Sequence, residues 1–573
     1  MATAAASAGW QPHQLSILTA MSVPLQQAWA TAIIAQLYAA GCRRAIICPG
    51  NRNVPLISAM LAHGQWQLRS HLDERSGAFR ALGWARATDT PVAIVTTSGS
   101  ALANTLPAVC EAAACAGALL IISCDRPENE HDCGAPQTMP QAGILQPFCQ
   151  HQMALPDPPA QQDLWPGLLA RISDIAHSCH SSPGPAHINV PLHNPQPWQE
   201  NPDAGKCPAM LIEDQPRGTD PVPPSLDLGP IAKAQRGVVV VGSDSPVDTR
   251  TLTAWAAAGW PIISDCLGTS RSAPLPTLIH QADLLLAAQP HAWDVDTIIR
   301  CGCAPLARPV WEWLQRQHQA TVLRFDQRPI ARDFCHTSFH YAGAGKAAAM
   351  LHLPPMDRQW HHSWLAAQER CSAIVDEYLD GWHELSAAAL ACRIHRPQHL
   401  FVANSLSVRH ANIFCSPQAP WQGIWGQRGV NGIDGNLGHA CGLSEALGPT
   451  RMLIGDCAFI HDSPALAAIA EASPALQIVV LDNRGGRIFD QLPAAQDPHL
   501  IPWIRSPQPG NIADVARAFT IPATAVSDRR TYIQALAQPL TGPQVIHVQI
   551  PDGPHDHLQS LHHRLRTTME TTT

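Results

Sequence analysis

Along most of the chain, short continuous apolar runs alternate with segments whose apolar residues recur at helical spacing. In the first third, the runs at 43–50, 91–100 and 118–125 are typical of buried strands, and the segments between them have the spacing of amphipathic helices. This alternation predicts βαβ units and hence a parallel sheet with helices on both faces. The first helix is expected over 25–40. Residues 1–21 lack a clear period and are expected to form an extension.

The pattern resumes after a Pro-rich stretch at 196–230, which has no periodicity and predicts a linker between domains. The first domain then covers 22–195. A second α/β domain is expected over 231–370 and a third over 385–555, with a solvated tail at 556–573. The fold class predicted from the pattern is therefore α/β, with three doubly wound domains in series.

Charge and composition exclude several classes of function. The 573-residue chain has a formal net charge of -8 with acids and bases interspersed, so it lacks the basic stripe of a protein that binds nucleic acid or a lipid surface. No apolar run approaches the roughly 18 residues that span a bilayer, and the N-terminal residues do not resemble a secretion signal. A cytoplasmic protein that acts on small molecules is expected.

The low share of charged residues allows two explanations. Charged residues make up 14% of the chain, against about 25% in an average soluble domain. Either much surface is buried between subunits, or the chain simply has an Ala- and Pro-rich composition.

Cysteines and histidines are numerous but form no specific motif. The 18 cysteines include no CxxC pair and are expected to be reduced and mostly buried. Near the C-terminus, a metal site is one interpretation of the histidines, although a solvated tail is preferred. These histidines are His555, His557, His562 and His563. The strand-glycine start of the middle domain carries no GxGxxG, which disfavours a dinucleotide site there.

Two strand ends in the third domain carry polar residues suited to a metal ion. One apolar strand ends at Asp456, and the next ends just before Asn483, 27 residues later, with a helix between them. A right-handed βαβ crossover makes the strands parallel and brings both residues to the same carboxyl edge. A carboxylate, an amide oxygen and a backbone carbonyl are ligands for Mg²⁺, which also binds phosphate oxygens. Gly485 and Gly486 would let the backbone close on a diphosphate.

This arrangement resembles the binding motif of thiamine-diphosphate enzymes. In that motif Gly-Asp follows one strand, Asp-Asn-x-Gly follows the next, and the acid, the asparagine and a backbone carbonyl two residues later hold the metal. By position, the resemblance assigns the metal to Asp456, Asn483 and the carbonyl of Gly485, with Gly455 also contacting the cofactor.

Thiamine chemistry also requires an acid that shares a proton with the aminopyrimidine ring of the cofactor. Glu74 stands where a strand meets a helix, in surroundings expected to be apolar, where a carboxyl group keeps its proton more readily. A lone carboxylate at a helix start is usually structural, favoured by the helix dipole. The segments that surround Glu74 favour the catalytic role.

Eight segments match one family of thiamine-diphosphate enzymes in order and approximate spacing. In the first domain they are CPGNRNVPL (48–56), LDER (72–75), TSGSALAN (97–104), CDRPE (124–128) and DCGAPQ (132–137). In the third domain they are NSLSVR (404–409), QRGVNGIDG (427–435) and GGRIFDQLP (485–493). The chain therefore resembles the 2-succinyl-5-enolpyruvyl-6-hydroxy-3-cyclohexene-1-carboxylate synthases of menaquinone biosynthesis over most of residues 22–553, with the middle domain matching least.

The resemblance implies an activity, cofactors and an assembly. The family uses thiamine diphosphate and Mg²⁺ to decarboxylate 2-oxoglutarate and to add the succinyl semialdehyde unit to isochorismate by 1,4-addition. Its cofactor lies between the first domain of one subunit and the third domain of another, so a homodimer or homotetramer is implied. Both substrates are dianions, for which bidentate guanidinium groups are well suited.

The matching segments also imply the site residues. The catalytic residues are Glu74, Ser405, Arg409 and Arg428, of which Glu74 and Ser405 also contact the cofactor and the two arginines bind substrate carboxylates. Ile433 is the apolar wedge that bends the cofactor. The residues that bind the isochorismate-like acceptor or close its pocket are Asn51, Arg52, Arg126, Gln137, Arg308, Ile488 and Phe489.

The sequence departs from the family mainly on the acceptor side. Asn51 and Asn53 replace two serines, and Pro136 replaces an asparagine, which removes a side-chain amide and a backbone donor. The basic residue of the middle domain falls at Arg308, and Arg484 interrupts a usual run of asparagines. Because a polar group left unpaired disfavours a substrate analogue, such changes can redirect acceptor specificity.

Two alternatives remain open from the sequence. One is a related carboligase or 2-oxoacid decarboxylase with a different acceptor, which only product analysis separates from the synthase. The other, of a different class, is a non-catalytic subunit with the thiamine-enzyme fold. The joint presence of Glu74, Asp456 and Asn483 argues against it, and an absence of cofactor binding would favour it.

Overall fold

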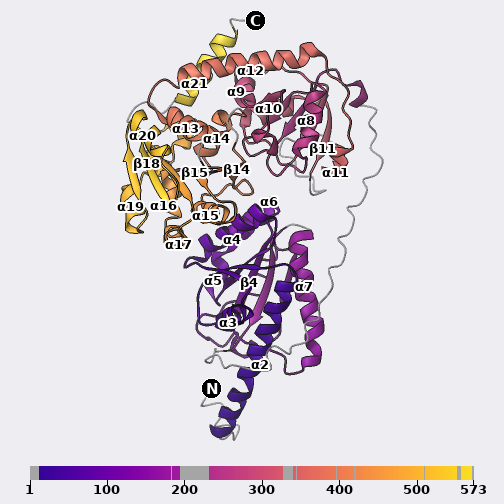
Figure 1. The fold of residues 1–573 in the computed structure, drawn as a ribbon, viewed down its shortest axis with the longest axis vertical. Coiled ribbons are helices and arrows are strands. Elements are labelled where there is room, and N and C mark those ends of the chain that lie inside the picture. The colour runs from indigo at the N-terminus through magenta and orange to yellow at the C-terminus, as the bar shows by residue number, and fades with distance from the viewer. Residues whose placement is uncertain are drawn as a thin grey trace. The chain divides into compact units, whose positions relative to one another are not determined.

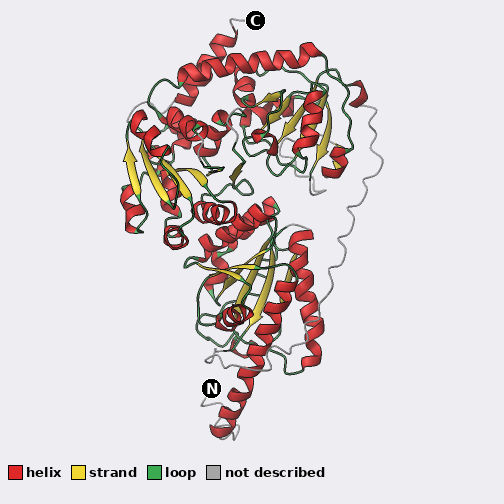
Figure 2. Cartoon of the chain, in the orientation of Figure 1, coloured by secondary structure: helices red, strands yellow, loops and turns green. Residues whose placement is uncertain are grey.

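The computed structural model describes residues 12–181, 184–193, 231–326, 340–343, 345–394, 397–417, 421–508, 510–551 and 557–570. Within these residues lie three six-stranded sheets, in which every paired strand is parallel, with helices along the connections (Figure 2). The predicted class of three α/β domains is confirmed. The linker expected at 196–230 lies outside the described residues.

The chain divides into two compact units. The first comprises Met1–Gly218, Gly429–Ala446 and Asp462–Ala472. The second comprises Thr219–Arg428, Leu447–His461 and Ser473–Thr573. Two helices from the last third of the sequence, α15 (Asn436–Leu447) and α17 (Ala465–Ala472), therefore lie wholly or mostly in the first unit.

The sheet of the first unit has the strand order β2-β1-β3-β4-β6-β5. Its strands are β1 (Arg44–Ile47), β2 (Gln67–Ser70), β3 (Val92–Thr96), β4 (Leu119–Asp125), β5 (His151–Ala154) and β6 (Ala186–Pro191) (Figure 1). Its helices are α2 (Pro12–Ala39), α3 (Val54–His63), α4 (Glu74–Thr88), α5 (Ser100–Asn104), α6 (Leu106–Cys115) and α7 (Trp165–Ser181). Every residue of β3 and β4 is buried, because apolar clusters cover both faces of the sheet, and this explains their continuous apolar runs.

The second unit holds the other two sheets, ordered β12-β11-β10-β7-β8-β9 and β14-β13-β15-β16-β18-β17. The middle sheet contains β7 (Gly237–Val241), β8 (Ile262–Ser264), β9 (Leu278–Ile279), β10 (Thr297–Cys301), β11 (Thr321–Phe325) and β12 (His340–Gly343). The last sheet contains β13 (His399–Val402), β14 (Gly423–Gly426), β15 (Thr450–Gly455), β16 (Leu476–Asp482), β17 (Ala523–Val526) and β18 (Gln544–Gln549). The first and last sheets have the same strand order, counted along their own strands.

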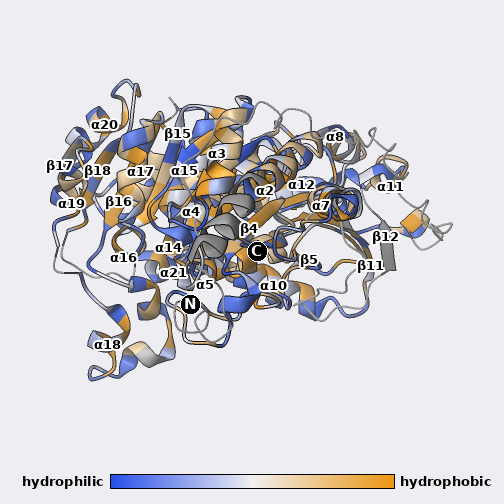
Figure 3. Ribbon diagram, turned by 90° about the horizontal axis from the view of Figure 1, so that it is seen from below, coloured by the Kyte–Doolittle hydropathy of each residue, from blue (hydrophilic) through white to orange (hydrophobic). Residues whose placement is uncertain are grey.

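The helices of the second unit carry both hydrophilic and hydrophobic residues, and several of their ribbons show both colours in Figure 3. They are α8 (Thr249–Ala257), α9 (Ala282–Ala288), α10 (Arg308–Arg316), α11 (Gly345–Ala349), α12 (Arg358–Tyr378), α13 (Glu384–Arg393), α14 (Leu406–Phe414), α16 (Asp456–His461), α18 (Ile501–Arg505), α19 (Ile512–Ala518), α20 (Arg529–Leu536) and α21 (His557–Glu570). One large cluster of buried residues joins helices of the middle domain to those of the last domain. The two domains of this unit therefore share a core.

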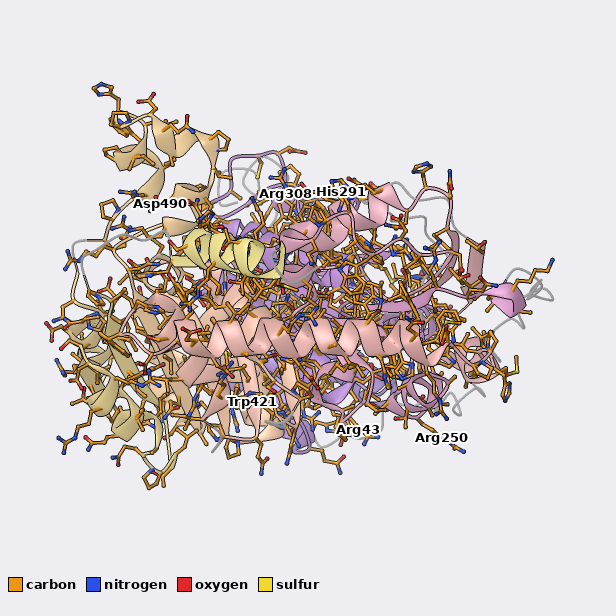
Figure 4. The ribbon with its side chains drawn as sticks, turned by 90° about the horizontal axis from the view of Figure 1, so that it is seen from above. Arg43, Arg250, His291, Arg308, Trp421 and Asp490 are labelled. Carbon is orange, nitrogen blue, oxygen red and sulfur yellow. The ribbon has the colours of Figure 1, made fainter. Side chains whose placement is uncertain are left out.

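Both ends of the chain are more helical than the pattern predicted. Helix α2 begins at Pro12 and not at 25, and a proline is well tolerated in the first turn of a helix. The expected solvated tail is instead α21, whose Leu561, Leu565 and Met569 are buried in the core. These residues recur every four positions and so share one helix face. Figure 4 shows this helix beside α12.

Three further expectations concern metal-binding groups, cysteines and membrane-spanning helices. The described residues contain no group of three or more His, Cys, Asp or Glu placed to hold a metal, and His555 lies outside them. The described cysteines are free and mostly buried, as expected. In the described part of the chain, no helix combines the length and the apolar character needed to cross a membrane.

Replacing Leu565 by alanine tests the packing of α21. Because this side chain is fully buried, its truncation should cost about 2–5 kcal/mol of stability and lower the midpoint of thermal or denaturant unfolding. The exposed Gln559 on the same helix gives the matched control, since Gln559→Ala should leave the midpoint unchanged. Equal midpoints for both variants would mean that α21 does not pack on the core in solution.

Candidate active site

Strand order decides where the expected site residues gather. In the first and last sheets the order reverses between β1 and β3 and between β13 and β15. Open α/β sheets bind their ligands at such a reversal, beyond the carboxyl ends of the strands. The loops and helix starts after these four strands carry Arg52, Ser98, Ser405 and Asp456. The fold therefore brings residues that are distant in sequence to one edge of each sheet.

The three expected metal ligands lie close together in the second unit. Strands β15 and β16 are parallel neighbours, paired up to Gly455 opposite Leu481, so Asp456 and Asn483 both leave the sheet at its carboxyl edge. The backbone N–H of Gly485 donates to Oδ2 of Asp456 at 2.7 Å. This hydrogen bond holds the turn after β16 against the start of α16.

The chemistry of this corner fits a hard cation. Asn483 is buried and its side chain hydrogen-bonds to Glu384, while its Oδ1 has no hydrogen-bond partner among the described residues. Burial raises the pKa of Asp456, and the charge of Asp482 raises it further. A bound Mg²⁺ would satisfy both the unpaired amide oxygen and the desolvated carboxylate.

Only glycine fits at the third ligand position. Gly485 has φ +116°, and a Cβ atom there would collide with the carbonyl oxygen of Arg505. The Gly485 carbonyl accepts the N–H of Arg487 at 2.8 Å. Because a carbonyl oxygen has two lone pairs, it can still bind a metal ion.

Ser405, Arg409 and Arg428 also come together, at the end of β13. Ser405 has φ +68° and ψ -130°, a costly conformation for a residue with a side chain and one that is concentrated at functional sites. Arg409 donates to the Ser405 carbonyl at 2.6 Å, and Arg428 donates to Oδ1 of Asn404 at 2.8 Å. Burial, and then the charge of Arg428, lower the pKa of Arg409. Because the two positive charges repel each other, an anionic ligand that contacts both guanidinium groups would be bound favourably.

From the middle domain the sequence predicted Arg308 as a site residue but did not reveal Asp265. Asp265, which follows β8, is buried and accepts the N–H of Leu306 at 2.8 Å. Burial raises the pKa of Asp265 to about 7, although Leu306, Arg271 and Arg428 oppose the shift and Asp283 adds to it. The middle domain thus places a carboxyl group within electrostatic reach of an expected substrate arginine.

Arg271 of the middle domain fixes the far end of α14, the helix that carries Arg409. Its buried guanidinium donates to the carbonyl oxygens of Cys415 at 2.9 Å and of Asn412. It also donates to the Ser264 carbonyl at 2.6 Å. The last carbonyls of a helix lack partners within the helix, and a cation there also complements the helix dipole. The position of α14 therefore depends on the middle domain.

In the first unit, Glu74 is the first residue of α4. Asp73 caps this helix by accepting the N–H of Ser76 at 3.1 Å. Glu74 is half-buried, and its Oε2 accepts the side-chain amide of Asn104 at 3.3 Å. The expected apolar surroundings thus include one polar partner, which orients the carboxyl group.

Helix α4 is held against α15 by a buried ion pair. Arg80 donates from Nε and Nη2 to the two carboxylate oxygens of Glu445, both at 2.8 Å. Gly83 faces the backbone of His439, so closely that a Cβ atom would overlap it. The direction of the helix that starts at Glu74 is therefore fixed along its length.

Arg52 and Arg126, which are expected to bind the acceptor, both lie near one carboxylate that the sequence did not identify. Oε2 of Glu130 lies 2.9 Å from Nη1 of Arg126 and 3.7 Å from Nη2 of Arg52. Asn51 is exposed. Asn53 is buried, and its side chain bonds to the Cys48 carbonyl at 2.8 Å and the Gly50 N–H at 3.2 Å. Asn53 therefore braces its own loop.

The remaining expected residues lie in several places. Gln137 is exposed and donates to the Ser98 carbonyl at 3.0 Å. Arg308 begins α10, is 74% exposed and pairs with Glu312 at 2.8 Å (Figure 4). Ile488 and Phe489 lie in a short 3₁₀ turn, Arg487–Gln491, with Phe489 exposed. Of these four described residues, only Gln137 contacts a loop beside the reversal of strand order, namely the loop after β3 that carries Ser98.

Another residue that the sequence missed, Glu111, holds the segment that precedes α15. Its carboxylate is buried in α6 and accepts the backbone N–H groups of Gly429 and Val430, each at 2.8 Å. Ile433 lies further along this segment and is half-buried, and its carbonyl accepts the side-chain amide of Asn436 at 2.8 Å. A buried Glu in a helix gives no sequence signal for such a contact.

Comparisons with known proteins place these features in a family. A family model described as the thiamine pyrophosphate enzyme, N-terminal TPP binding domain, matches residues 28–146, and one described as the middle domain of thiamine pyrophosphate matches residues 229–402. The chain is 32% identical to the 2-succinyl-5-enolpyruvyl-6-hydroxy-3-cyclohexene-1-carboxylate synthase of Rubrobacter xylanophilus, over 91% of this chain and 95% of that protein. It is 30% identical to the protein of the same name from Chloroflexus aurantiacus, over 90% and 92%.

Asp265 should make stability depend on pH. Its carboxyl pKa is raised to about 7 in the folded chain, so the folded state binds a proton that the unfolded state releases at lower pH. The stability that this bound proton contributes to the folded state is fully present below the ordinary carboxyl pKa and is lost as pH rises through about 7. Between roughly pH 5 and pH 8, the free energy of unfolding of the wild type should fall by on the order of 2 kcal/mol relative to that of Asp265→Asn.

The exposed Asp174 on α7 gives the control, because Asp174→Asn should parallel the wild type across this range. A profile of Asp265→Asn that also parallels the wild type would show that Asp265 ionises normally in the folded protein.

Proposed function

The chain belongs to the family of 2-succinyl-5-enolpyruvyl-6-hydroxy-3-cyclohexene-1-carboxylate synthases, and from this membership we propose that it decarboxylates 2-oxoglutarate with thiamine diphosphate and Mg²⁺ and transfers the succinyl semialdehyde unit to isochorismate. The observation that carries the proposal is the buried corner of Asp456 and Asn483, whose unpaired amide oxygen fits a metal ion. That corner also disfavours a non-catalytic subunit, because a chain that binds no cofactor has no need to bury these groups.

The proposed reaction assigns a role to each residue expected near the cofactor. When bound, thiamine diphosphate supplies the carbon nucleophile and accepts the electrons that the departing CO₂ leaves behind. Asp456, Asn483 and the Gly485 carbonyl would hold the Mg²⁺ ion. Glu74 would share a proton with the aminopyrimidine ring, and Asn104 keeps its carboxyl group oriented.

The donor and the acceptor bind through different arginines. Arg409 and Arg428 take the carboxylates of 2-oxoglutarate, and their mutual repulsion in the free protein is relieved when an anion binds. Ser405 faces the reacting centre from its strained turn. On the acceptor side, Arg52 and Arg126 take the carboxylates of isochorismate.

The proposed assembly is at least a homodimer in the cytoplasm. In it, the cofactor lies between the Glu74 region of one subunit and the Asp456 region of another. The low share of charged residues, 14%, supports burial of surface between subunits, and a molar mass measured in solution would separate dimer from tetramer.

The function is tested by incubating the purified protein with thiamine diphosphate, Mg²⁺ and 2-oxoglutarate, with and without isochorismate, and following CO₂ and product mass. The succinyl adduct is expected. Glu74→Gln should bind the cofactor but release CO₂ at least 100-fold more slowly, on the order of the loss of an acid–base group. CO₂ without adduct would support a carboligase or decarboxylase with another acceptor, and no CO₂ would contradict the proposal.

Asp456→Ala should weaken cofactor binding through the metal. Loss of a charged oxygen ligand should raise the Kd for thiamine diphosphate about 10–100-fold, and raising the Mg²⁺ concentration should recover part of the loss. Titration of intrinsic tryptophan fluorescence with cofactor measures the Kd. The neighbouring Asp482, which bonds to His547 at 2.8 Å, gives a control of the same charge, since Asp482→Asn should affect the Mg²⁺ dependence less. Equal affinities of Asp456→Ala and wild type would remove Asp456 from the metal site.

A further inference from the structure

The two acceptor-side arginines of the free chain already share a carboxylate. Glu130 ends the 3₁₀ turn Glu128–Glu130, and its Oε2 contacts both guanidinium groups, at 2.9 Å from Arg126 and 3.7 Å from Arg52. The side chains of both arginines are largely buried, with 4% of Arg52 and 15% of Arg126 exposed. Two buried cations that repel each other need nearby anions. Glu130 contacts both of them, and the buried Asp125 acts on Arg52 from within electrostatic reach.

The contact with Glu130 is weaker than a substrate carboxylate could make. Arg126 uses one nitrogen, Nη1, toward Glu130, and its Nε is buried with no hydrogen-bond partner among the described residues. A carboxylate bound in the bidentate manner would engage two donors of the guanidinium group and would be stronger than the single contact. Glu130 is also partly exposed, at 24% of its side chain, so water can solvate it when it leaves.

The arginines themselves are held independently of Glu130. Nη1 of Arg52 donates to the Leu192 carbonyl at 2.7 Å, which holds this guanidinium group without Glu130. For Arg126 it is the backbone that is held independently, since its carbonyl contacts Nε2 of His131 at 2.9 Å and its N–H donates to Oδ1 of Asp125 at 2.7 Å. Removing the Glu130 charge should therefore leave Arg52 in place and take away one of the two carboxylates that act on it, the other being the buried Asp125.

We propose that Glu130 is a specificity-determining residue of the acceptor site, because its carboxylate occupies the position between Arg52 and Arg126 that a carboxylate of the acceptor takes. An acceptor binds there only by displacing Glu130. The site then discriminates against molecules whose carboxylate cannot engage more donors than Glu130 does. The inference rests on the proposed function, since it takes Arg52 and Arg126 as acceptor-side residues.

The test compares Glu130→Gln with Glu128→Gln. Glu128 lies in the same turn and is exposed, so its variant makes the same charge change away from the arginines. The Kd for isochorismate is measured by equilibrium dialysis against the full-length protein loaded with thiamine diphosphate and Mg²⁺, without 2-oxoglutarate. Glu130→Gln should lower the Kd about tenfold, the size of a coupling between close charges, and Glu128→Gln should leave it unchanged.

A double variant distinguishes displacement of Glu130 by the acceptor from a general effect of removing one negative charge. With Arg126→Ala in the background, Glu130→Gln should lower the Kd much less, because the cation for which the two carboxylates compete is absent. In turnover, the ratio of the KM for isochorismate to the KM for 2-oxoglutarate should fall in Glu130→Gln. An equal or higher Kd in Glu130→Gln, or an equal gain in Glu128→Gln, would overturn the inference.

Failure of the inference can be distinguished from failure of the proposed function. If the wild type forms the adduct and Glu130→Gln binds isochorismate no more tightly, only the inference fails. If no adduct forms but Glu130→Gln still binds isochorismate more tightly, only the proposed reaction fails. If neither protein binds isochorismate, both are wrong.

Discussion

The parallel direction of neighbouring strands is the constraint on which the candidate site depends. Parallel strands of one sheet all end at the same edge, so residues that follow different strands meet there whatever their distance in sequence. Asp456 and Asn483 follow the neighbouring strands β15 and β16, and Ser405 follows β13, the other neighbour of β15. A slip or inversion of one strand would separate these residues.

Buried polar groups then fix the loops that the sheet leaves free. Arg271 binds the last carbonyls of α14, and Glu111 binds two consecutive N–H groups before α15. The Arg80–Glu445 pair joins two helices through two hydrogen bonds of 2.8 Å. Burying a charge is costly unless it is fully paired, so these groups contribute little net stability. Each instead favours one arrangement of the backbone, because any other would leave a buried charge unpaired.

The arginines proposed to bind the donor and those proposed to bind the acceptor differ in their contacts in the free chain. Arg409 and Arg428 donate to neutral oxygens, of Ser405 and Asn404, and Asp265 lies within electrostatic reach of Arg428. Arg52 and Arg126 already face Glu130. If the proposed roles hold, an anion at Arg409 and Arg428 would relieve their mutual repulsion, whereas an anion at Arg52 and Arg126 would have to replace the carboxylate of Glu130. This contrast fits the sequence, whose departures from the family at Asn51 and Pro136 also lie on the acceptor side.

The sequence by itself determined the fold class, the order of the elements and the residues after β15 and β16, because strand and helix periods and strand-end chemistry are local properties. It also determined the family, whose motifs are contiguous segments. Only the tertiary structure decided which side chains are already engaged. The side chain of Asn53 bonds within its own loop, Arg308 pairs with Glu312 at the surface, and the last helix packs on the core. Glu130, Glu111, Asp265 and Arg271 carried no motif, because each has at least one partner that lies far away in the sequence. Their roles are set by burial and by distance, which a linear pattern of residues does not contain.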